Sequence, residues 1–354
     1  MIRRTLAPTW LGMHRRIFFL TGLFLFASSS FSAPDVGRNY VIGCTIYDEQ
    51  ARILRRYDGD LCLFHNDGRV FSAGKHFIAR DKTLATLWRH PISLHHQLNW
   101  SVDRTKILAM GRETIRMGDR EIQWDLLYVF KLDGRVEKEF SFYENRAMLA
   151  AKGLSMQIME TVSPDRPESP FPEYTHANSF YEIPPNANAA RHPAFAAGNY
   201  IVNLLNEPIF ILDKDLKRVL WSLKYPLGRW IHDVQVLANG NLLIYVNMTS
   251  ESRGKFSALD EFNPLDKKIV WTFRAKEPHQ FNSPGRGGVQ LLADKTIFYS
   301  DATNDNYGVH ITRKGEEVWR RRFISNDYRT GRPVTIQQIK QVDLGAFLRK
   351  NPGP

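Results

Sequence analysis

Short apolar runs alternate with turn-forming residues along most of this chain. The clearest unit spans residues 230–273, with apolar runs at 230–236, 242–246, 257–262 and 268–273. Asn239-Gly240-Asn241 separates the first two runs, and Asn263-Pro264 lies before the last one. Both are turn signals of the kind that join antiparallel strands. The pattern therefore predicts a four-stranded unit rather than helices.

This unit repeats along the chain. Trp221, Trp271 and Trp319 follow one another at intervals of 50 and 48 residues. In each case two charged residues and one or two apolar residues come directly before the tryptophan. A period of about 40–50 residues with four strands per repeat is typical of a β-propeller. We predict an all-β protein with six four-stranded blades. Five blades are visible in the sequence, and the sixth is expected from the two ends, with residues 335–342 as the closing strand.

One segment breaks the repeat. Residues 143–174 include an amphipathic stretch at 147–159, which predicts a short helix, and a proline-rich stretch at 163–172, which excludes regular structure. We interpret residues 143–174 as a largely irregular insertion that crosses one face of the propeller. A lid over the central opening is one use for such a loop.

The first residues have the pattern of a secretory signal. Four arginines precede an apolar run at 17–27, and small residues follow up to Ser32. We assign residues 1–32 to a signal peptide, with translation starting at Met1 or at Met13, and residues 33–354 to a single propeller domain. The mature protein is then periplasmic or otherwise exported, with no membrane span after signal removal. An uncleaved signal anchor is the alternative.

The net charge of +11 does not indicate a nucleic-acid partner, because four of the positive charges lie in the signal and most others are scattered. Only two cysteines exist, Cys44 and Cys62. In an exported protein they could form a disulfide, or they could be two buried thiols. Both a disulfide and two free thiols remain possible at this point.

Candidate chemistry comes from histidines at equivalent places in different units. Aligning the repeats on their turns puts His96 and His232 at the start of the innermost strand of their blades, and His176 opens the corresponding strand of its blade. Gly287 holds that place in the last unit. Because innermost strands face the central channel, we expect the three imidazoles to meet. Histidine can act as base, acid or nucleophile, and three together could also bind a zinc-like ion.

Other residues near this predicted site could assist. Asn178 follows His176 by two positions and could donate to a developing anion, and Arg229 and Arg286 could attract one. Asp233 could hold the tautomer of an imidazole or cap a turn. The backbone at Gly287-Gly288 could supply further donors.

Five segments, taken in order, resemble the arylsulfate sulfotransferases: GCTIYDEQA (43–51), SLHHQLN (93–99), THANSFYEIP (175–184), IHDVQVLANGNLL (231–243) and SALDEFNPLDKKIVWTF (257–273). The resemblance implies a periplasmic six-bladed propeller that moves a sulfuryl group from a phenolic sulfate ester to a phenol. It implies a ping-pong reaction through a sulfated histidine, without a nucleotide donor. We expect no cofactor and no metal; the partners are small molecules, and a homodimer stays open.

Mapped onto this chain, the resemblance makes His232 the sulfated residue and His96, His176 and Asn178 its neighbours. Two departures stand out: Gln97 replaces an aspartate, and the strand at 201–208 has Leu204 near the place of an arginine. Arg229 could replace that charge. Two alternatives remain: a metal-dependent lyase or hydrolase with three histidine ligands, and a non-catalytic propeller that binds small anionic or aromatic ligands.

Overall fold

A computed structural model describes residues 38–154, 172–205, 208–225, 228–249, 256–276, 281–301, 306–324 and 338–351. The chain divides after Val36, and everything described below belongs to the unit Gly37–Pro354. The segment assigned to a signal peptide, residues 1–32, lies outside the described residues. Within the described residues, no helix is long and apolar enough to cross a membrane.

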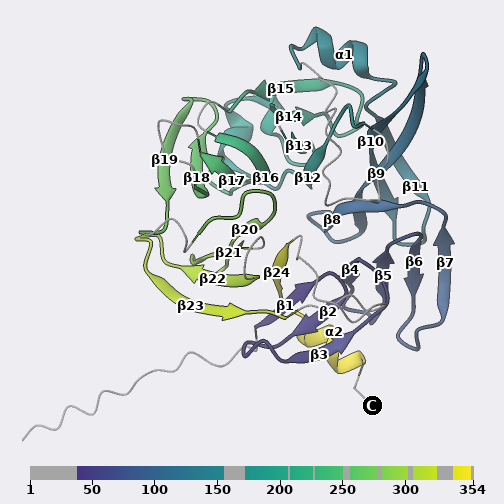
Figure 1. Ribbon diagram of the computed structural model, residues 1–354, viewed down its shortest axis with the longest axis vertical. Helices are drawn as coiled ribbons and strands as arrows, with labels where there is room; N and C mark the ends of the chain where they lie inside the picture. Colours follow the sequence, from purple (N-terminus) through teal and green to yellow (C-terminus); the bar gives the residue numbers. More distant parts are fainter. Residues whose placement is uncertain are drawn as a thin grey trace, which may run out of the picture. The chain divides into compact units, whose positions relative to one another are not determined.

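The described strands form six sheets of four strands each, which confirms the prediction of a six-bladed propeller. Figure 1 shows the innermost strand of each sheet, β4, β8, β12, β16, β20 and β24, around a common centre. Neighbouring strands within each sheet are antiparallel. The blades contain, from the innermost strand outward, β24 (Ile339–Val342), β1 (Asn39–Ile42), β2 (Thr45–Tyr47) and β3 (Ile53–Arg56); β4 (Leu61–Phe64), β5 (Val70–Ala73), β6 (Phe77–Arg80) and β7 (Thr86–His90); β8 (Leu94–Trp100), β9 (Lys106–Met117), β10 (Arg120–Lys131) and β11 (Val136–Ser141); β12 (Ala177–Glu182), β13 (Tyr200–Leu204), β14 (Ile209–Leu212) and β15 (Val219–Leu223); β16 (Gly228–Val236), β17 (Leu242–Thr249), β18 (Ala258–Asn263) and β19 (Lys268–Phe273); β20 (Gly288–Leu291), β21 (Ile297–Asp301), β22 (Tyr307–Ile311) and β23 (Glu317–Arg322).

The two ends of the propeller share one blade. β24 pairs with β1, with Tyr40 opposite Gln341, so the last strand of the chain completes the sheet that the first three strands begin. The closing strand expected at residues 335–342 is thus confirmed for Ile339–Val342. This pairing covers a strand edge that would otherwise be exposed.

The turns between inner strands have a common cause. Asp103, Asn239 and Asp294 each accept, through the side-chain oxygen, the backbone N–H of the residue two positions later, at 3.0 Å in every case. Such a side chain stabilises a tight turn because it accepts a backbone N–H that has no backbone partner there. The turn residues that aligned the repeats in the sequence therefore hold equivalent hairpins in the structure.

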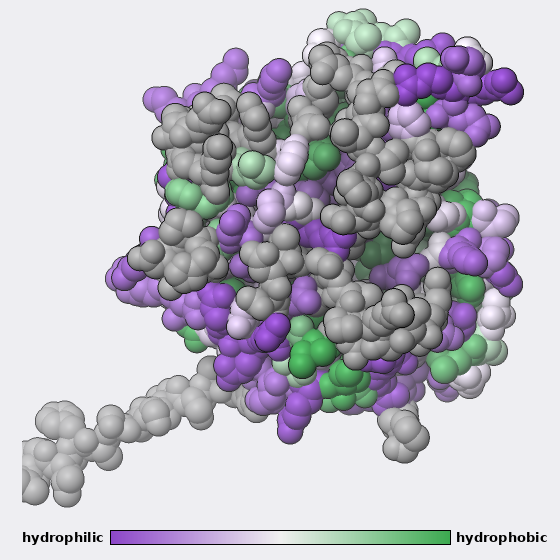
Figure 2. Space-filling view, in the orientation of Figure 1, coloured by the Kyte–Doolittle hydropathy of each residue, from purple (hydrophilic) through white to green (hydrophobic). Residues whose placement is uncertain are grey.

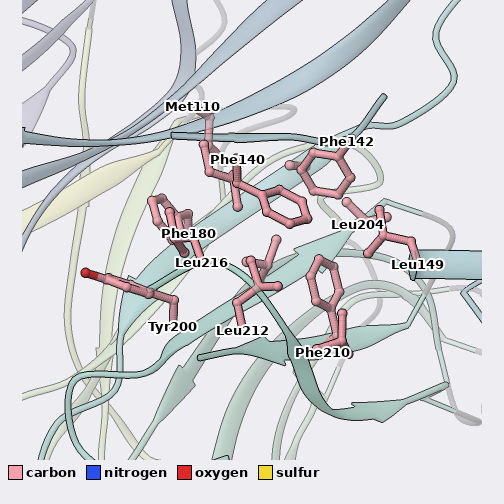
Figure 3. Packing of buried hydrophobic residues seen from close by; sticks show 14 of the residues in the cluster. Met110, Phe140, Phe142, Leu149, Phe180, Tyr200, Leu204, Phe210, Leu212 and Leu216 are labelled. Carbon is pink, nitrogen blue, oxygen red and sulfur yellow. The ribbon is translucent and has the colours of Figure 1, made fainter. Parts of the chain in front are cut away.

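The repeated tryptophans lie on outermost strands and contact the next blade. Trp271 donates its indole N–H to the carbonyl of Arg313 at 2.8 Å, and the ring of Trp319 stacks on Tyr40 with centroids 4.8 Å apart. Large aromatic rings on these outermost strands thus fill the space between neighbouring sheets. Figure 3 shows one such cluster, between β9–β11 and β12–β14, which includes Phe142, Leu204 and Phe210.

Among the residues that the structure describes, two α-helices lie outside the blades: α1 (Arg146–Ala151) and α2 (Gly345–Lys350). α1 begins the predicted insertion but is shorter than the helix expected at 147–159, and residues 155–171 lie outside the described residues. Two 3₁₀ turns, η1 (Ala187–Ala190) and η2 (Pro193–Phe195), connect β12 to β13. The paired extension of β9 and β10 beyond Gly111 was not predicted from the sequence.

The two cysteines are joined as a disulfide. Cys44 lies in the turn between β1 and β2, and Cys62 lies on β4 of the next blade. The bridge therefore links two blades. Among the coloured residues in Figure 2, most are hydrophilic, and the apolar ones form small separate patches.

Candidate functional site

The three histidines singled out in the sequence meet at one place. His96 comes from β8, His176 immediately precedes β12, and His232 comes from β16, so three successive blades contribute one ring each. The ring centroid of His96 lies 4.7 Å from that of His176 and 6.3 Å from that of His232. His176 and His232 are buried, whereas His96 is half-buried. The structure therefore brings the predicted residues together.

Irregular strand pairing positions these side chains. The register shifts between His95 and Leu98 on β8, between Ala177 and Ser179 on β12, and between Ile231 and Asp233 on β16. Each bulge turns a residue out of the regular alternation, and bulges of this kind often lie beside active sites. His96 also has a φ of 60°, which costs about 1–2 kcal/mol for a residue with a Cβ. Such strain concentrates at functional sites.

Three further groups extend the His96–His176 pair into a continuous series of contacts. His96 Nε2 lies 2.8 Å from His176 Nε2, and His96 Nδ1 lies 3.0 Å from His95 Nδ1. At the ends, His95 Nε2 lies 3.0 Å from Asp125 Oδ1, and His176 Nδ1 lies 2.5 Å from Glu173 Oε2. We call Asp125, His95, His96, His176 and Glu173 the histidine string.

Both carboxylates of the histidine string are anchored elsewhere. Asp125 is buried on β10, and its Oδ2 accepts the backbone N–H of Ala177 at 2.7 Å. Glu173 Oε1 lies 3.1 Å from the guanidinium of Arg112 on β9. Burial, and then the Arg112 charge, lower the pKa of His95, whereas the adjacent Asp125 carboxylate opposes that shift. His95 is therefore favoured as a neutral ring.

His232 has its own partner. Its Nδ1 lies 2.6 Å from Asn247 Oδ1, and the Asn247 amide nitrogen donates to the carbonyls of Ser283 and Arg286 at 2.6 and 2.7 Å. Because two carbonyls can only accept, the amide NH₂ must face them, and the amide oxygen must face His232. His232 Nδ1 therefore carries a proton, and Nε2 holds the lone pair of the neutral ring.

The structure gives contacts for some of the predicted assisting groups. The Asn178 amide donates to the carbonyl of Ile231 at 2.8 Å, so it links two blades next to His232. The Gly288 N–H donates to Ser300 Oγ at 2.9 Å rather than pointing into the site. Arg229 lies on β16, opposite Met248, and its side chain lies outside the described part of the structure. Arg286 contributes its carbonyl, as a partner of Asn247.

Asp233 neither orients His232 nor caps a turn. It is buried, and its Oδ2 accepts from the Val289 N–H and from the Gln338 amide, both at 3.0 Å. Burial raises the pKa of Asp233. Burial also lowers the pKa of Lys340 to about 8, and the Asp233 charge opposes that change. Asp233 on β16, the Val289 N–H on β20 and Gln338, which precedes β24, therefore form a polar network between innermost strands.

The two departures from the resemblance have structural consequences. Leu204 is buried within the hydrophobic cluster of Figure 3, near Leu149, so an arginine at this position would have to enter an apolar core. Gln97 is also buried, and its side-chain oxygen accepts from the Asn99 amide at 2.9 Å. Neither position supplies a charge to the histidines.

The ring arrangement does not favour a metal site. Both nitrogens of His96 and both nitrogens of His176 face other side chains at hydrogen-bond distance, so their lone pairs do not converge on one point. Across the described residues, no group of three or more His, Cys, Asp or Glu side chains is arranged to hold a metal ion.

His95, beside His96, was not singled out from the sequence. Four residues of this site that are more distant in sequence were also missed: Asp125, Glu173, Arg112 and Asn247. Asp125 and Arg112 lie on the unpredicted extension of β9 and β10, and no turn or repeat marks them. Glu173 lies three positions before His176, a spacing that could have drawn attention to it. Asn247 is the only one on a strand that the repeat predicted, but its amide gives no signal of its own.

The chain matches no protein-family model and no curated protein sequence. Its structure is similar to that of a protein of unknown function from Bacteroides caccae, with a TM-score of 0.53 and 13% identity, covering 86% of this chain and 99% of that one. Other similar structures are BamB from Moraxella catarrhalis (TM-score 0.38, 12% identity, 81% and 76% covered) and the β-propeller domain of Myceliophteria thermophila Cps50 (Swd1) (TM-score 0.42, 10% identity, 87% and 77% covered). At these identities the similarity shows the fold alone, which is a β-propeller.

Proposed function

We propose that this protein transfers a sulfuryl group from an aryl sulfate to a phenol, with His232 as the nucleophile. The observation that carries the proposal is the orientation of His232: Asn247 accepts from its Nδ1, which leaves the lone pair on Nε2, beside His96. Neutral imidazole is both a competent nucleophile and a good leaving group, as a two-step transfer requires.

The reaction has two halves. His232 Nε2 attacks the sulfur of the ester, an N–S bond forms, and the S–O bond to the aryl group breaks to release a phenolate that takes up a proton. In the second half, the oxygen of an acceptor phenol attacks the same sulfur as the phenol loses its proton. The N–S bond then breaks and returns its electrons to His232.

In this proposal His96 and His176 lie beside the sulfuryl oxygens. Both nitrogens of each ring face other side chains, so the His96–His176 contact opens when the substrate binds and frees an N–H to donate. Charge is redistributed over these oxygens in the transition state, and fixed N–H donors stabilise it. The aryl group of the donor needs an apolar surface, and Trp230 is the nearest exposed aromatic residue in sequence, two positions before His232 on β16.

We also propose that the protein is exported. The disulfide between Cys44 and Cys62 supports this location, because such bonds persist mainly in oxidising compartments. The N-terminal sequence pattern at residues 1–32 is the second line of support.

The test is release of a chromogenic phenol from an aryl sulfate, with a second phenol as acceptor. Wild-type protein should release it in proportion to enzyme, and His232→Ala should release none. After reaction with donor alone, mass spectrometry should find one sulfuryl group added to the peptide containing His232. Equal release by wild type and His232→Ala would remove the proposal, and ligand binding without turnover would favour a non-catalytic propeller.

A further inference from the structure

The histidine string contains four contacts in series, and each needs one proton. The contacts are Asp125–His95, His95–His96, His96–His176 and His176–Glu173. Three neutral imidazoles bring only three ring protons. With three protons, one of the four contacts would set two lone pairs against each other at 3.0 Å or less. The geometry therefore requires a fourth proton.

The carboxylates are not the place for this proton. His95 Nε2 also lies 3.2 Å from the Gly111 carbonyl, which can only accept, so Nε2 carries a proton and donates to Asp125 Oδ1. The other oxygen of Asp125 accepts from the Ala177 N–H. Glu173 faces the permanent charge of Arg112, which favours its ionised form. The fourth proton consequently belongs to the rings, and makes one of them an imidazolium.

His95 is the least suitable ring to carry this charge. Burial and the Arg112 guanidinium lower its pKa. The charge then resides on the other two rings, with the Glu173 carboxylate 2.5 Å from His176 Nδ1 to stabilise it. The groups of fixed or variable charge that face these rings are Arg112 from β9, Asp125 from β10, Glu173 before β12, and His232 from β16.

We propose that the His96–His176 pair carries one positive charge at neutral pH and that this charge binds the anionic group of the ligand, an oxyanion such as a sulfate ester. The binding part rests on the proposed function; the count of protons does not. When an aryl sulfate reacts, the fourth proton can pass to the departing phenolate oxygen, and the acceptor phenol can return one to the string.

The first experiment determines the charge of the rings. Full-length mature protein labelled with ¹⁵N-histidine is measured by long-range ¹H–¹⁵N NMR at pH 7, where imidazolium and both neutral tautomers give distinct nitrogen shifts. The wild type should show one imidazolium among His95, His96 and His176, lost at higher pH. Glu173→Gln should show none, because a glutamine amide can donate to His176 Nδ1 and three protons then satisfy all four contacts.

Controls separate this effect from general disturbance. Glu173→Ala removes one of the four contacts altogether and should also leave all three rings neutral, which protects the test if Glu173→Gln does not fold. Glu261→Gln replaces another buried glutamate, one that binds Asn239 and Asn241, and should retain the imidazolium. Three neutral rings in the wild type, or an unchanged imidazolium in both string variants, would overturn the proposal.

The second experiment tests binding with inorganic sulfate as the probe, by calorimetry at pH 7. The loss of one charge should weaken sulfate binding about tenfold in Glu173→Gln, since a unit charge a few ångströms from an anion is worth ~1–4 kcal/mol. No sulfate binding, or equal binding by both proteins, would remove the ligand role. An imidazolium without phenol release would support the charge on the histidine string and contradict the proposed sulfuryl transfer. Phenol release with three neutral rings would support the transfer and contradict the charge.

Discussion

Asn247 Oδ1 lies 2.6 Å from Nδ1 of His232, while the amide nitrogen of the same residue is held by two backbone carbonyls. Asn247 cannot rotate its amide without placing NH₂ against the ring and leaving two carbonyls facing an oxygen. The neutral His232 is thereby fixed as the tautomer with its lone pair on Nε2. Asn247 is a positioning residue: it acts on the reaction only through His232.

Replacing Asn247 should therefore change catalysis more than substrate binding. Asn247→Leu, which is similar in shape, should lower kcat for phenol release roughly 10²-fold, the scale of a misplaced proton in acid–base catalysis. KM for the aryl sulfate should change little, and the His232 nitrogen shifts should show a mixture of tautomers. Asn203→Leu is the matched control, because Asn203 is buried and binds the Ile231 carbonyl without touching the ring. An equal loss of kcat in both variants would assign Asn247 a structural role only.

Trp230 should affect the opposite kinetic parameter. Its side chain is 38% exposed, and it precedes His232 by two positions on β16. If its ring contacts the aryl group, Trp230→Ala should raise KM for aryl sulfates about tenfold with kcat nearly unchanged, because an aromatic pair is worth ~0.5–1.5 kcal/mol beyond the area that it buries. Ile324→Ala, at an apolar residue that is 69% exposed elsewhere, should leave both parameters unaltered. An unchanged KM in Trp230→Ala would place the aryl group elsewhere.

The sequence sufficed for the blades because each blade repeats the same local physics. Three features recur: apolar alternation, a tight turn with Asp or Asn, and a tryptophan on the outermost strand. A strand that is ambiguous in one repeat can therefore be assigned from its equivalents in the others. The same alignment brought His96 and His232 to equivalent places. What it could not provide was the partner of each ring. Asp125 and Asn247 approach the histidines across strands, from positions that no periodicity distinguishes.

Leu204 illustrates the other limit. From the sequence, Leu204 could be described only as the residue near the place where the resemblance implies an arginine. Arg229 was suggested as a replacement for that charge. The structure places Leu204 in the packing between two blades and locates a different cation, Arg112, on an extended hairpin that the repeat did not contain. The extra length of the β9–β10 hairpin decides this, and it leaves little trace in the repeat pattern.

The disulfide should contribute measurably to stability. Cys44 and Cys62 are 18 residues apart in sequence, and a bridge closing a loop of this size restricts the unfolded chain by ~3 kcal/mol. The double variant Cys44→Ser/Cys62→Ser should lose about that much free energy of unfolding in urea. Wild-type protein unfolded in the presence of a reductant should match the variant. Identical unfolding midpoints with and without reductant would contradict the prediction.

Gly287 should not tolerate a side chain. Its φ is +118°, and a Cβ there would lie 2.3 Å from Tyr245 Oη and 2.7 Å from the Ser300 carbonyl. Gly287→Ala should cost ~3 kcal/mol or more, from backbone strain together with overpacking. Gly118 also has a positive φ, but a Cβ there would meet nothing within 4 Å, so Gly118→Ala should cost only ~1 kcal/mol. Equal losses from the two substitutions would show that conformation alone, and not the Tyr245 contact, decides the effect.

His310 should make the protein sensitive to mild acid. It is fully buried between Trp319 and Phe298, with Tyr40 Oη 3.0 Å from its Nε2. Burial, and then the Arg38 charge, lower its pKa to about 4. Between pH 6.5 and 4 the unfolded chain therefore binds a proton that the folded protein does not, so stability falls as the pH falls through this range. At 1.36 kcal/mol per pH unit, the loss is about 3 kcal/mol.

The measurement is urea unfolding at pH 7.5 and at pH 4.5 for wild type and His310→Phe, at constant ionic strength. The variant leaves the Tyr40 hydroxyl without its partner and should be less stable at pH 7.5 by ~1–3 kcal/mol. The informative quantity is the difference between the two pH values, which removes that offset and the contribution of all other titrating groups. This difference should be smaller in His310→Phe by about 2–3 kcal/mol, the part of the shift that falls within the range measured. Equal pH dependence in the two proteins would mean that His310 is protonated in the fold and that its surroundings stabilise the charge.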